Sequence, residues 1–542
     1  MPFSIRQNLH RPEVKSELNK YLSNRHIIII HVDFTSREAH ILLEYTNRSS
    51  LDTEPAIYLA LKHLPGRTFK DCCHFYSDGA KVSPTPSYIE LSTSQQPPPQ
   101  TVQPRSLLEL RQLAKGLSSR GINNQLRSNS LWRVRPWKHC TRSSGDVVDI
   151  AITNTHFALA SVTSNDVYNQ TGALMIGDFE QEQLSILNNH TITVYNGDQP
   201  ETRYASVSDV KFSHDESLLF SGSYDSTIKI WTPSGQLVNS VNDHASKITM
   251  MATSSIGPRI FAATTDHGVT FVYNVSSDAS ELTRHEFNCY MPDMHGSFLT
   301  FGQSQNAKYL FCGYSCYTHD VKREDDKITG GALQYYDLEN GSCTRIIPGG
   351  QSIESIFVHE RGSLVTGSTF YNGLETRVRL FSSPSQGCKR MTEFDSAQKE
   401  LHVVTISPCE RFITASGNLS CTEVWDVRNP DKIMTLLKHG APKIINQPDQ
   451  QLQDYDPGVA AATWYNSDFL SGGSDGCVHV WDLLKSDPFK FTLHEQGTII
   501  QSIAVSPDNN KIIVGGTREA SFLSLGIHQN IGYFTIKEQE IY

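Results

Sequence analysis

One repeated pattern restricts the fold of this chain more than any other feature of its 542 residues. Its clearest copies are Val210–Trp231 and Asp468–Asp482, in which Gly, Ser and Asp separate short alternating runs of apolar and polar residues. A Trp ends the third run in both copies, and weaker copies follow one another at a spacing of about 40 residues. Short, evenly spaced strands bounded by turn residues indicate an all-β fold built from many small sheets.

These features are typical of WD repeats, in which each unit forms one blade of a β-propeller. The sequence therefore predicts a mainly all-β fold with a WD40 β-propeller over residues 145–542. We count eight blades, with seven as the alternative if one unit is distorted or shared. The expected units lie at about residues 147–187, 207–240, 247–287, 297–347, 352–394, 402–437, 458–493 and 500–539.

Several polar residues recur at fixed places in the repeat, and we expect them to be structural rather than ligands or bases. They are the turn aspartates Asp225, Asp266 and Asp475 and the histidines His190, His244 and His439, which stand where a blade begins. Residues 317–327 and 440–456 interrupt the period. Long loops on a rigid scaffold often carry binding, and tolerated solvated excursions are the alternative here.

Three regions precede the propeller. Residues 1–83 mix helical and strand patterns and predict a small α+β N-terminal region of unassigned function. Residues 84–104 are rich in Pro and Gln, which favours a linker. Residues 105–144 form a basic segment that we expect to be helical at its start and to serve in docking.

The basic segment has nine Lys/Arg and one Glu between residues 105 and 142, a net charge of +8 in a chain of −10. Ser106–Glu109 matches a capping box, and the leucines that follow at helical spacing form one apolar stripe. This helix could pack on the propeller itself, dock in a partner's groove, or contact phosphate. The stripe consists of Leu107, Leu110, Leu113 and Leu117.

Composition and motifs exclude several classes of protein. The net charge of −10 argues against a coat of nucleic acid over the whole chain and leaves local nucleic-acid binding open. The longest apolar run, Ile27–Val32, is too short to span a membrane, and eleven scattered cysteines indicate reduced thiols in the cytosol or nucleus. We find no P-loop, nucleophile elbow, HExxH pair or zinc-ligand spacing, so we expect no enzyme, no cofactor and no metal.

The sixth unit ends with Trp425, Asp426, Val427 and Arg428. A Trp-Asp-x-Arg sequence that closes a blade resembles the box of substrate receptors of cullin-4-type ubiquitin ligases, a family that includes the damaged-DNA-binding small subunit. That resemblance implies that Trp425, Asp426 and Arg428, together with the leucine stripe, dock on a triple-propeller ligase adaptor. The box usually has Asp six residues before the Trp, where this chain has Leu419, which leaves the geometry of that turn in question.

Within that family the layout is most similar to the fungal WD40 subunit of the heterochromatin complex that joins a ligase to a histone H3 lysine methyltransferase. The resemblance covers about residues 105–542 and implies a non-enzymatic receptor or scaffold in the nucleus, on chromatin, with a cytoplasmic pool left open. The implied partners are the adaptor, a cullin bound through it, the methyltransferase and other chromatin proteins. One alternative is a stand-alone reader of histone tails or peptides that uses the upper central pocket. Another is an enzyme that uses the N-terminal region.

Overall fold

The computed structural model divides the chain into two compact units, Met1–Ala114 and Lys115–Tyr542, which are described separately. The described residues are 27–30, 67–71, 87–93, 131, 134–196, 199–289, 294–316, 331–347, 351–370, 375–443, 458–524 and 532–538. Among these residues, no helix is long and apolar enough to cross a membrane.

The first unit contains a three-stranded sheet with strand order β1-β3-β2. Strand β1 (Ile27–Ile30) pairs in parallel with β3 (Ser87–Thr93), and β2 (Arg67–Asp71) pairs with β3 in antiparallel fashion. The central strand therefore lies inside residues 84–104, the range for which the sequence predicts a linker. The prolines stand on either side of a run rich in β-forming residues, Tyr88-Ile-Glu-Leu-Ser-Thr, and do not interrupt it.

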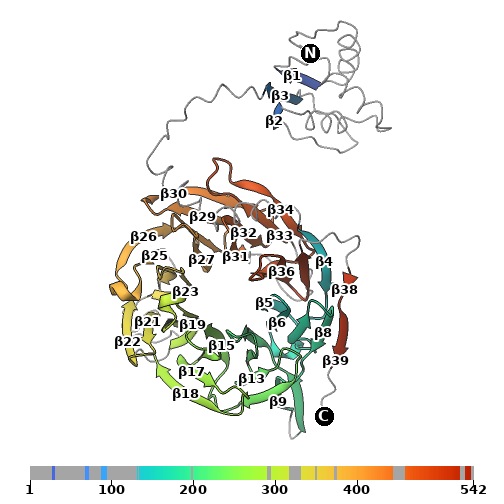
Figure 1. The fold of residues 1–542 in the computed structure, drawn as a ribbon, viewed down its shortest axis with the longest axis vertical. Helices are drawn as coiled ribbons and strands as arrows, with labels where there is room; N and C mark the ends of the chain where they lie inside the picture. Colours follow the sequence, from blue (N-terminus) through green and yellow to red (C-terminus); the bar gives the residue numbers. More distant parts are fainter. Residues whose placement is uncertain are drawn as a thin grey trace. The chain divides into compact units, whose positions relative to one another are not determined.

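The described residues of the second unit form eight sheets arranged in a ring (Figure 1). Blade 1 contains β5 (Asp146–Ile152), β6 (His156–Val162), β7 (Leu174–Asp178) and β8 (Gln183–Ile186). Blade 2 contains β11 (Val207–Phe212), β12 (Leu219–Ser223), β13 (Ile228–Trp231) and β14 (Leu237–Val241). Blade 3 contains β15 (Ile248–Ser254), β16 (Ile260–Thr265), β17 (Val269–Val275) and β18 (Leu282–Asn288).

The next three blades repeat this order. Blade 4 contains β19 (Met294–Phe301), β20 (Tyr309–Cys316), β21 (Ala332–Asp337) and β22 (Ser342–Ile347). Blade 5 contains β23 (Gln351–Val358), β24 (Leu364–Phe370), β25 (Thr376–Phe381) and β26 (Arg390–Ser396). Blade 6 contains β27 (Leu401–Ile406), β28 (Phe412–Gly417), β29 (Cys421–Asp426) and β30 (Asn429–Lys438).

Two further blades complete the ring. Blade 7 contains β31 (Val459–Tyr465), β32 (Asp468–Gly473), β33 (Cys477–Trp481) and β34 (Phe489–Glu495). Blade 8 contains β35 (Ile500–Val505), β36 (Lys511–Gly516), β37 (Ala520–Ser524) and β4 (Arg135–Cys140). The prediction of eight blades is thus confirmed. A hairpin that the repeat pattern did not predict, β9 (Thr191–Asn196) with β10 (Gln199–Tyr204), is inserted between blades 1 and 2.

Blade 8 takes its fourth strand from the segment that precedes the propeller. Strand β4 pairs with β37, so the propeller begins before residue 145 and includes the end of the expected docking segment 105–144. The strand contains several basic residues, which hide its alternation of buried and exposed positions in the sequence. Lys138 and Cys140 are buried, while Arg135 is exposed. The closure therefore joins the two ends of the propeller within one sheet.

The C-terminal residues close the ring a second time. Strand β38 (Gly532–Tyr533) pairs in parallel with β4 of blade 8, and β39 (Thr535–Glu538) pairs in parallel with β8 of blade 1. Between them, Phe534 is 5% exposed and packs in the core between these two blades. The expected last unit, 500–539, is therefore divided between two blades.

The first strand of each blade carries a β-bulge near its start, so all eight units share one local geometry. Side chains at some of these bulges bind the next blade. Ser208 Oγ donates a hydrogen bond to Ile248 O at 2.7 Å, and Thr249 Oγ1 donates to Gly296 O at 2.8 Å. The bulge thus orients a side chain across the gap between blades.

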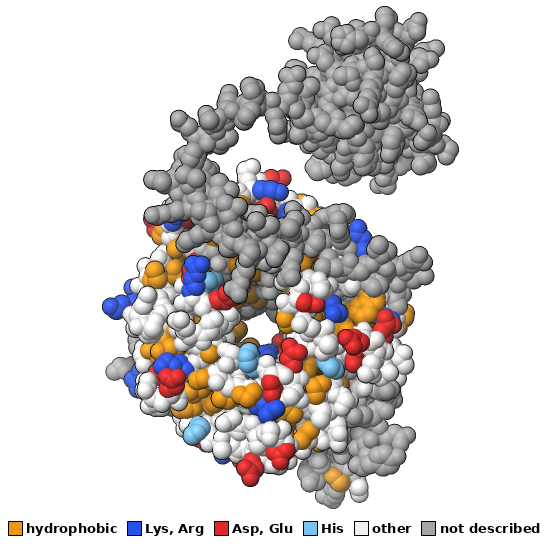
Figure 2. Space-filling model, in the orientation of Figure 1, with side chains coloured by type: hydrophobic (Ala, Val, Ile, Leu, Met, Phe, Trp, Pro, Cys, Tyr) orange, Lys and Arg blue, Asp and Glu red, His pale blue; other side chains and the backbone are white. Residues whose placement is uncertain are grey.

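The hydrophobic core lies between neighbouring blades, in a ring of clusters. Glycines on the second strands allow close contact there: a Cβ on Gly222 would lie 2.6 Å from Ile248, and one on Gly472 would lie 2.3 Å from Ile500. On the face seen in Figure 2, basic and acidic side chains are interspersed among polar and hydrophobic ones. The described part of that face therefore presents no large basic surface for nucleic acid.

Burial of histidines gives the propeller a predictable acid sensitivity. Burial lowers the pKa of His494 to about 4, and its Nε2 has no hydrogen-bond partner among the described residues. The unfolded chain then binds more protons than the folded chain between about pH 6.5 and pH 4, so stability falls as the pH falls through that window. We expect the contribution of His494 to the free energy of unfolding in urea to be about 2 kcal/mol smaller at pH 5 than at pH 7. In His494→Gln the free energy of unfolding should depend less on pH. An unchanged pH dependence in this variant would contradict the assignment.

Candidate partner-docking site on the lower face

The lower face is defined here as the face on which the first and third strands of each blade end. Antiparallel pairing places the turn between the third and fourth strands on this face in blades 1 to 7, in which the fourth strand follows the third along the chain. In blade 6 that turn joins β29 to β30 and contains the expected box, with Asp426 at the end of β29 and Arg428 in the turn. The sequence thus places the box at the rim of the lower face.

Trp425 belongs to the core and not to the surface. It is 1% exposed, and its ring lies 5.6 Å from that of Phe394 in the cluster between blades 5 and 6. The indole therefore holds the end of β29 in place. Direct contact of Trp425 with the adaptor stays a prediction, and the burial of its ring favours a supporting role for it.

Asp426 and Arg428 form a tight pair at the rim. Arg428 Nε donates to Asp426 Oδ1 at 2.9 Å, and Arg428 Nη2 donates to Oδ2 at 2.6 Å. The backbone N–H of Arg428 also donates to Oδ1, at 3.0 Å, and Arg411 Nε donates to Oδ2 at 3.1 Å. These donors hold the pKa of the Asp426 carboxyl well below its usual range, so the carboxylate orients the guanidinium throughout the physiological pH range.

Arg428 remains accessible while it is held in this way. Its side chain is 55% exposed, and it forms an ion pair with Asp426 rather than with Asp431. A fixed, exposed guanidinium can present its remaining N–H groups to acceptors of a partner at small entropic cost.

A hollow of about 360 Å³ lies beside the box, between the outer strands of blades 5 and 6. Several of its lining acids are already paired: Glu393 accepts from Arg379 at 2.5 Å and from Arg390 at 3.2 Å, and Asp395 pairs with Arg377. Its acidic composition is therefore largely neutralised within blade 5. The lining residues are Glu393, Asp395, Trp425, Pro430, Asp431, Lys432 and Ile433.

The turn that lacks the usual aspartate is held by a different set of contacts. Gln398 Oε1 accepts from the N–H of Leu419 at 2.8 Å, and Gln398 Nε2 donates to Cys421 O at 3.0 Å. Glu423 accepts from Ser396 Oγ at 2.5 Å, and burial raises the pKa of its carboxyl. The substitution at Leu419 therefore does not leave the turn unsupported.

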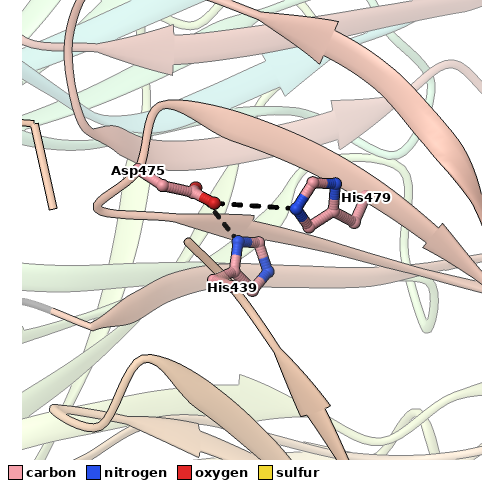
Figure 3. A group of neighbouring side chains, drawn as sticks. All are labelled: His439, Asp475 and His479. Atoms are coloured by element: carbon pink, nitrogen blue, oxygen red, sulfur yellow. Dashed lines mark hydrogen bonds and ion pairs between the residues drawn. The ribbon is translucent and has the colours of Figure 1, made fainter. Parts of the chain in front are cut away.

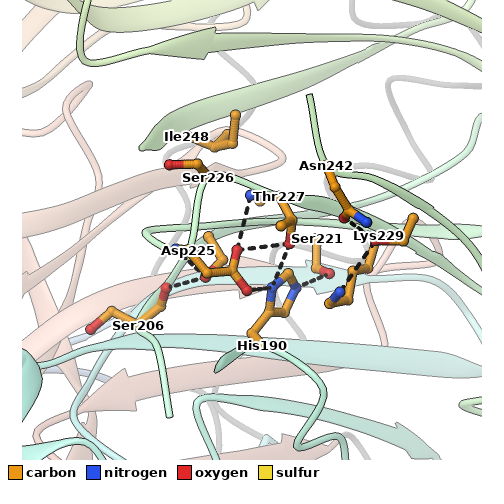
Figure 4. Close-up of polar contacts among 12 residues, drawn as sticks. His190, Ser206, Ser221, Asp225, Ser226, Thr227, Lys229, Asn242 and Ile248 are labelled. Carbon is orange, nitrogen blue, oxygen red and sulfur yellow. Dashed lines mark hydrogen bonds and ion pairs between the residues drawn. The ribbon is translucent and has the colours of Figure 1, made fainter. Parts of the chain in front are cut away.

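Blade 2 contains a hydrogen-bond network of His, Asp, Ser and Trp (Figure 4). Blade 6 has the contacts of Gln398 and Glu423 instead. His190 Nδ1 lies 2.8 Å from Asp225 Oδ2, and His190 Nε2 lies 2.8 Å from Ser221 Oγ. Trp231 Nε1 donates to the same Ser221 Oγ at 2.8 Å. Every polar atom of the histidine ring is satisfied within the blade, as the structural assignment of His190 and Asp225 predicts.

Blade 7 repeats this network and adds a second histidine (Figure 3). His439 Nδ1 lies 3.1 Å from Asp475 Oδ1, and its Nε2 lies 2.7 Å from Ser471 Oγ, which accepts from Trp481 Nε1. His479 Nε2 lies 3.6 Å from Asp475 Oδ2. These three residues are spaced closely enough to hold a metal. Binding a metal would break the contacts of His439, so we assign the group to the structural network.

The leucine stripe of the basic segment, Leu107, Leu110, Leu113 and Leu117, lies outside the described residues, as do residues 317–327 and most of 440–456. The described structure does fix where the segment reaches the propeller. Arg135, the first residue of β4, pairs with Ser524 at the lower end of β37. Leu131 is fully buried in the cluster between blades 7 and 8. Leu131 and Arg135 therefore lie toward the lower face, where Arg428 also lies.

Comparisons with known proteins agree with this architecture. The family WD domain, G-beta repeat matches residues 190–232 and 450–482. Over 530 residues the chain is 28% identical to Rik1-associated factor 1 of Schizosaccharomyces pombe. The aligned part covers 92% of this chain and 78% of that protein.

Solved structures show the same likeness. A structure of the Dos1 propeller matches with a TM-score of 0.65 and 27% identity, over 76% of this chain and 100% of that one. The crystal structure of Sqt1 from Saccharomyces cerevisiae matches in fold alone, with a TM-score of 0.52 and 10% identity over 72% of this chain and 99% of that one. The chain therefore carries WD repeats and forms an eight-bladed β-propeller, and over most of its length it is similar to Rik1-associated factor 1.

Proposed function

We propose that this protein is a non-enzymatic receptor or scaffold subunit of a cullin-4-type ubiquitin ligase. We further propose that it acts on chromatin in the nucleus, together with a histone H3 lysine methyltransferase. The similar yeast protein is named for its association with Rik1, and a counterpart of Rik1 is the adaptor that we propose here. The cullin would be bound through that adaptor.

The observation that carries this proposal is the exposed, oriented Arg428 on the face at which the basic segment reaches the propeller. The guanidinium is held by Asp426 through two side-chain hydrogen bonds, and the side chain is 55% exposed. Leu131 and Arg135, which follow the leucine stripe in the sequence, lie toward the same lower face and support this proposal. A single partner surface could therefore contact both parts.

The mechanism is one of placement rather than of chemistry. The lower face would hold the adaptor, and the upper face and long loops would present a target to the ligase. The leucine stripe would contribute apolar area at roughly 25 cal/mol per Å², before the cost of ordering the segment. Charges at the rim would fix orientation and speed the encounter, and both effects would weaken with salt.

Arg428→Ala is expected to weaken binding to the adaptor at least tenfold without unfolding the propeller, because it removes an exposed cation. The measurement is affinity purification of the tagged full-length protein from its own cells, quantified by mass spectrometry. Arg203→Ala is a matched control, because Arg203 also pairs with a carboxylate two residues earlier, Glu201, at 2.8 Å. It lies on the hairpin β9–β10 and should leave recovery unchanged.

A second variant tests the leucine stripe in the same experiment. Leu110→Asp/Leu113→Asp should also reduce recovery of the adaptor and cullin. If the wild type recovers neither protein, the ligase proposal is wrong, and the stand-alone peptide reader takes its place. If recovery is normal in both variants, the class can stand but the docking residues are wrong.

A further inference from the structure

The turn that carries Arg428 has structural equivalents in other blades, and their chemistry differs around the rim. In four blades an aspartate stands at or directly after the end of the third strand. Its Oδ1 accepts from the backbone N–H two residues later, which fixes the same turn each time. The four pairs are Asp178 with Glu180 at 2.7 Å, Asp337 with Glu339 at 3.0 Å, Asp426 with Arg428 at 3.0 Å, and Asp482 with Leu484 at 3.2 Å.

These equivalent positions form two groups that differ in the chemistry of their side chains. Blades 1 and 4 carry exposed acids, Glu180 and Glu339, of which Glu339 accepts from Lys308 Nζ at 2.7 Å. Blade 6 carries a cation, and the adjacent blade 7 carries Leu484, which is 67% exposed. Lys485 follows it and is 61% exposed. The rim is therefore cationic and apolar over blades 6 and 7 and acidic at the same position on blades 1 and 4.

Leu484 does not stand alone on blade 7. Phe489, at the other side of the same turn, is 47% exposed and lies with its ring 5.4 Å from that of Trp481. Single exposed apolar residues are common, but two on one short turn, in the blade that follows the blade of Arg428, form a small apolar surface. The basic segment reaches the propeller next to this blade, through Leu131 between blades 7 and 8.

We propose that Leu484 is an apolar anchor of the adaptor-docking surface, which extends from Arg428 on blade 6 across the turn of blade 7. The partner surface that fits it has an apolar pocket flanked by carboxylates. Such a surface would attract Arg428 and Lys485, and Glu180 would repel it if it approached the rim at blade 1. The inference rests on the proposed function, because it names a further contact of the same docking site.

The test uses the full-length protein and the purified adaptor recovered from the same cells, with affinity measured by biolayer interferometry. Leu484→Asp gives blade 7 the acidic side chain that blades 1 and 4 carry, and it should weaken binding at least tenfold. Leu484→Met keeps an apolar side chain of similar volume and should bind within about twofold of wild type. Because Leu484 is exposed, each variant should unfold at the wild-type temperature.

Glu339→Leu is the matched control, since it places a leucine in the equivalent turn of blade 4. It should leave the affinity unchanged. If Leu484→Asp binds as tightly as wild type while Arg428→Ala is weakened, the anchor is wrong and the docking site of blade 6 stands. If Glu339→Leu and Leu484→Asp weaken binding equally, the asymmetry of the rim is wrong. If wild type itself does not bind, the proposed function fails first.

Discussion

Phe534→Ala is expected to lower the free energy of unfolding of the propeller by about 3–5 kcal/mol, the usual cost of removing a buried Phe side chain. The ring is 5% exposed and lies 4.7 Å from Phe522 of blade 8 and 5.1 Å from Phe157 of blade 1, measured between ring centroids. It therefore fills the core at the junction where the propeller closes. Urea unfolding followed by tryptophan fluorescence measures the change.

Tyr533→Ala is the control for this prediction, because Tyr533 is the preceding residue and is 69% exposed. It should change the stability by less than 1 kcal/mol. A truncation before residue 532 should cost at least as much as Phe534→Ala, because it also uncovers the edges of β4 and β8. Equal effects of Phe534→Ala and Tyr533→Ala would show that the C-terminal residues do not close the ring.

Asp475→Ala is expected to cost about 3–5 kcal/mol, because it removes one partner of a buried, hydrogen-bonded network. The carboxylate accepts from the backbone N–H of Gly440 at 2.7 Å and from that of Cys477 at 3.0 Å, and it pairs with His439. All of these groups would lose their acceptor at once. These contacts also hold the pKa of Asp475 well below its usual range, so the network persists in mild acid.

Asp487→Ala provides the comparison for Asp475→Ala within the same blade. Asp487 is exposed, and its replacement should change the stability by no more than about 0.5 kcal/mol. Chemical denaturation of the two variants beside wild type gives both values. A loss below 1 kcal/mol in Asp475→Ala would mean that the network is not needed to hold blade 7.

The repeat pattern predicted the propeller, the eight blades and the structural histidines because these depend on local contacts within 40 or so residues. It could not predict β4, because the pairing of Arg135–Cys140 with Ala520–Ser524 joins opposite ends of the chain. The same holds for Phe534, whose partners come from blades 1 and 8. Long-range closure leaves little periodic signal in either segment.

The box itself was visible in the sequence, but the roles of its members were not. Burial of Trp425 follows from the packing of blade 5 against blade 6, which the motif does not contain. The support of the turn at Leu419 by Gln398 required the coordinates, because no motif links these residues. The equivalence of Leu484 and Arg428 could have been found by aligning each residue three places after the closing Trp.

We propose that the lower rim of blades 6 and 7 holds the adaptor, and hydrogen–deuterium exchange of the full-length protein, with and without the purified adaptor, can test this. We expect slower exchange at residues 427–432 and 483–489 in the complex, with unchanged exchange at the equivalent turns 179–182 and 338–341. Protection confined to the loops of the upper face, with none at blades 6 and 7, would contradict it.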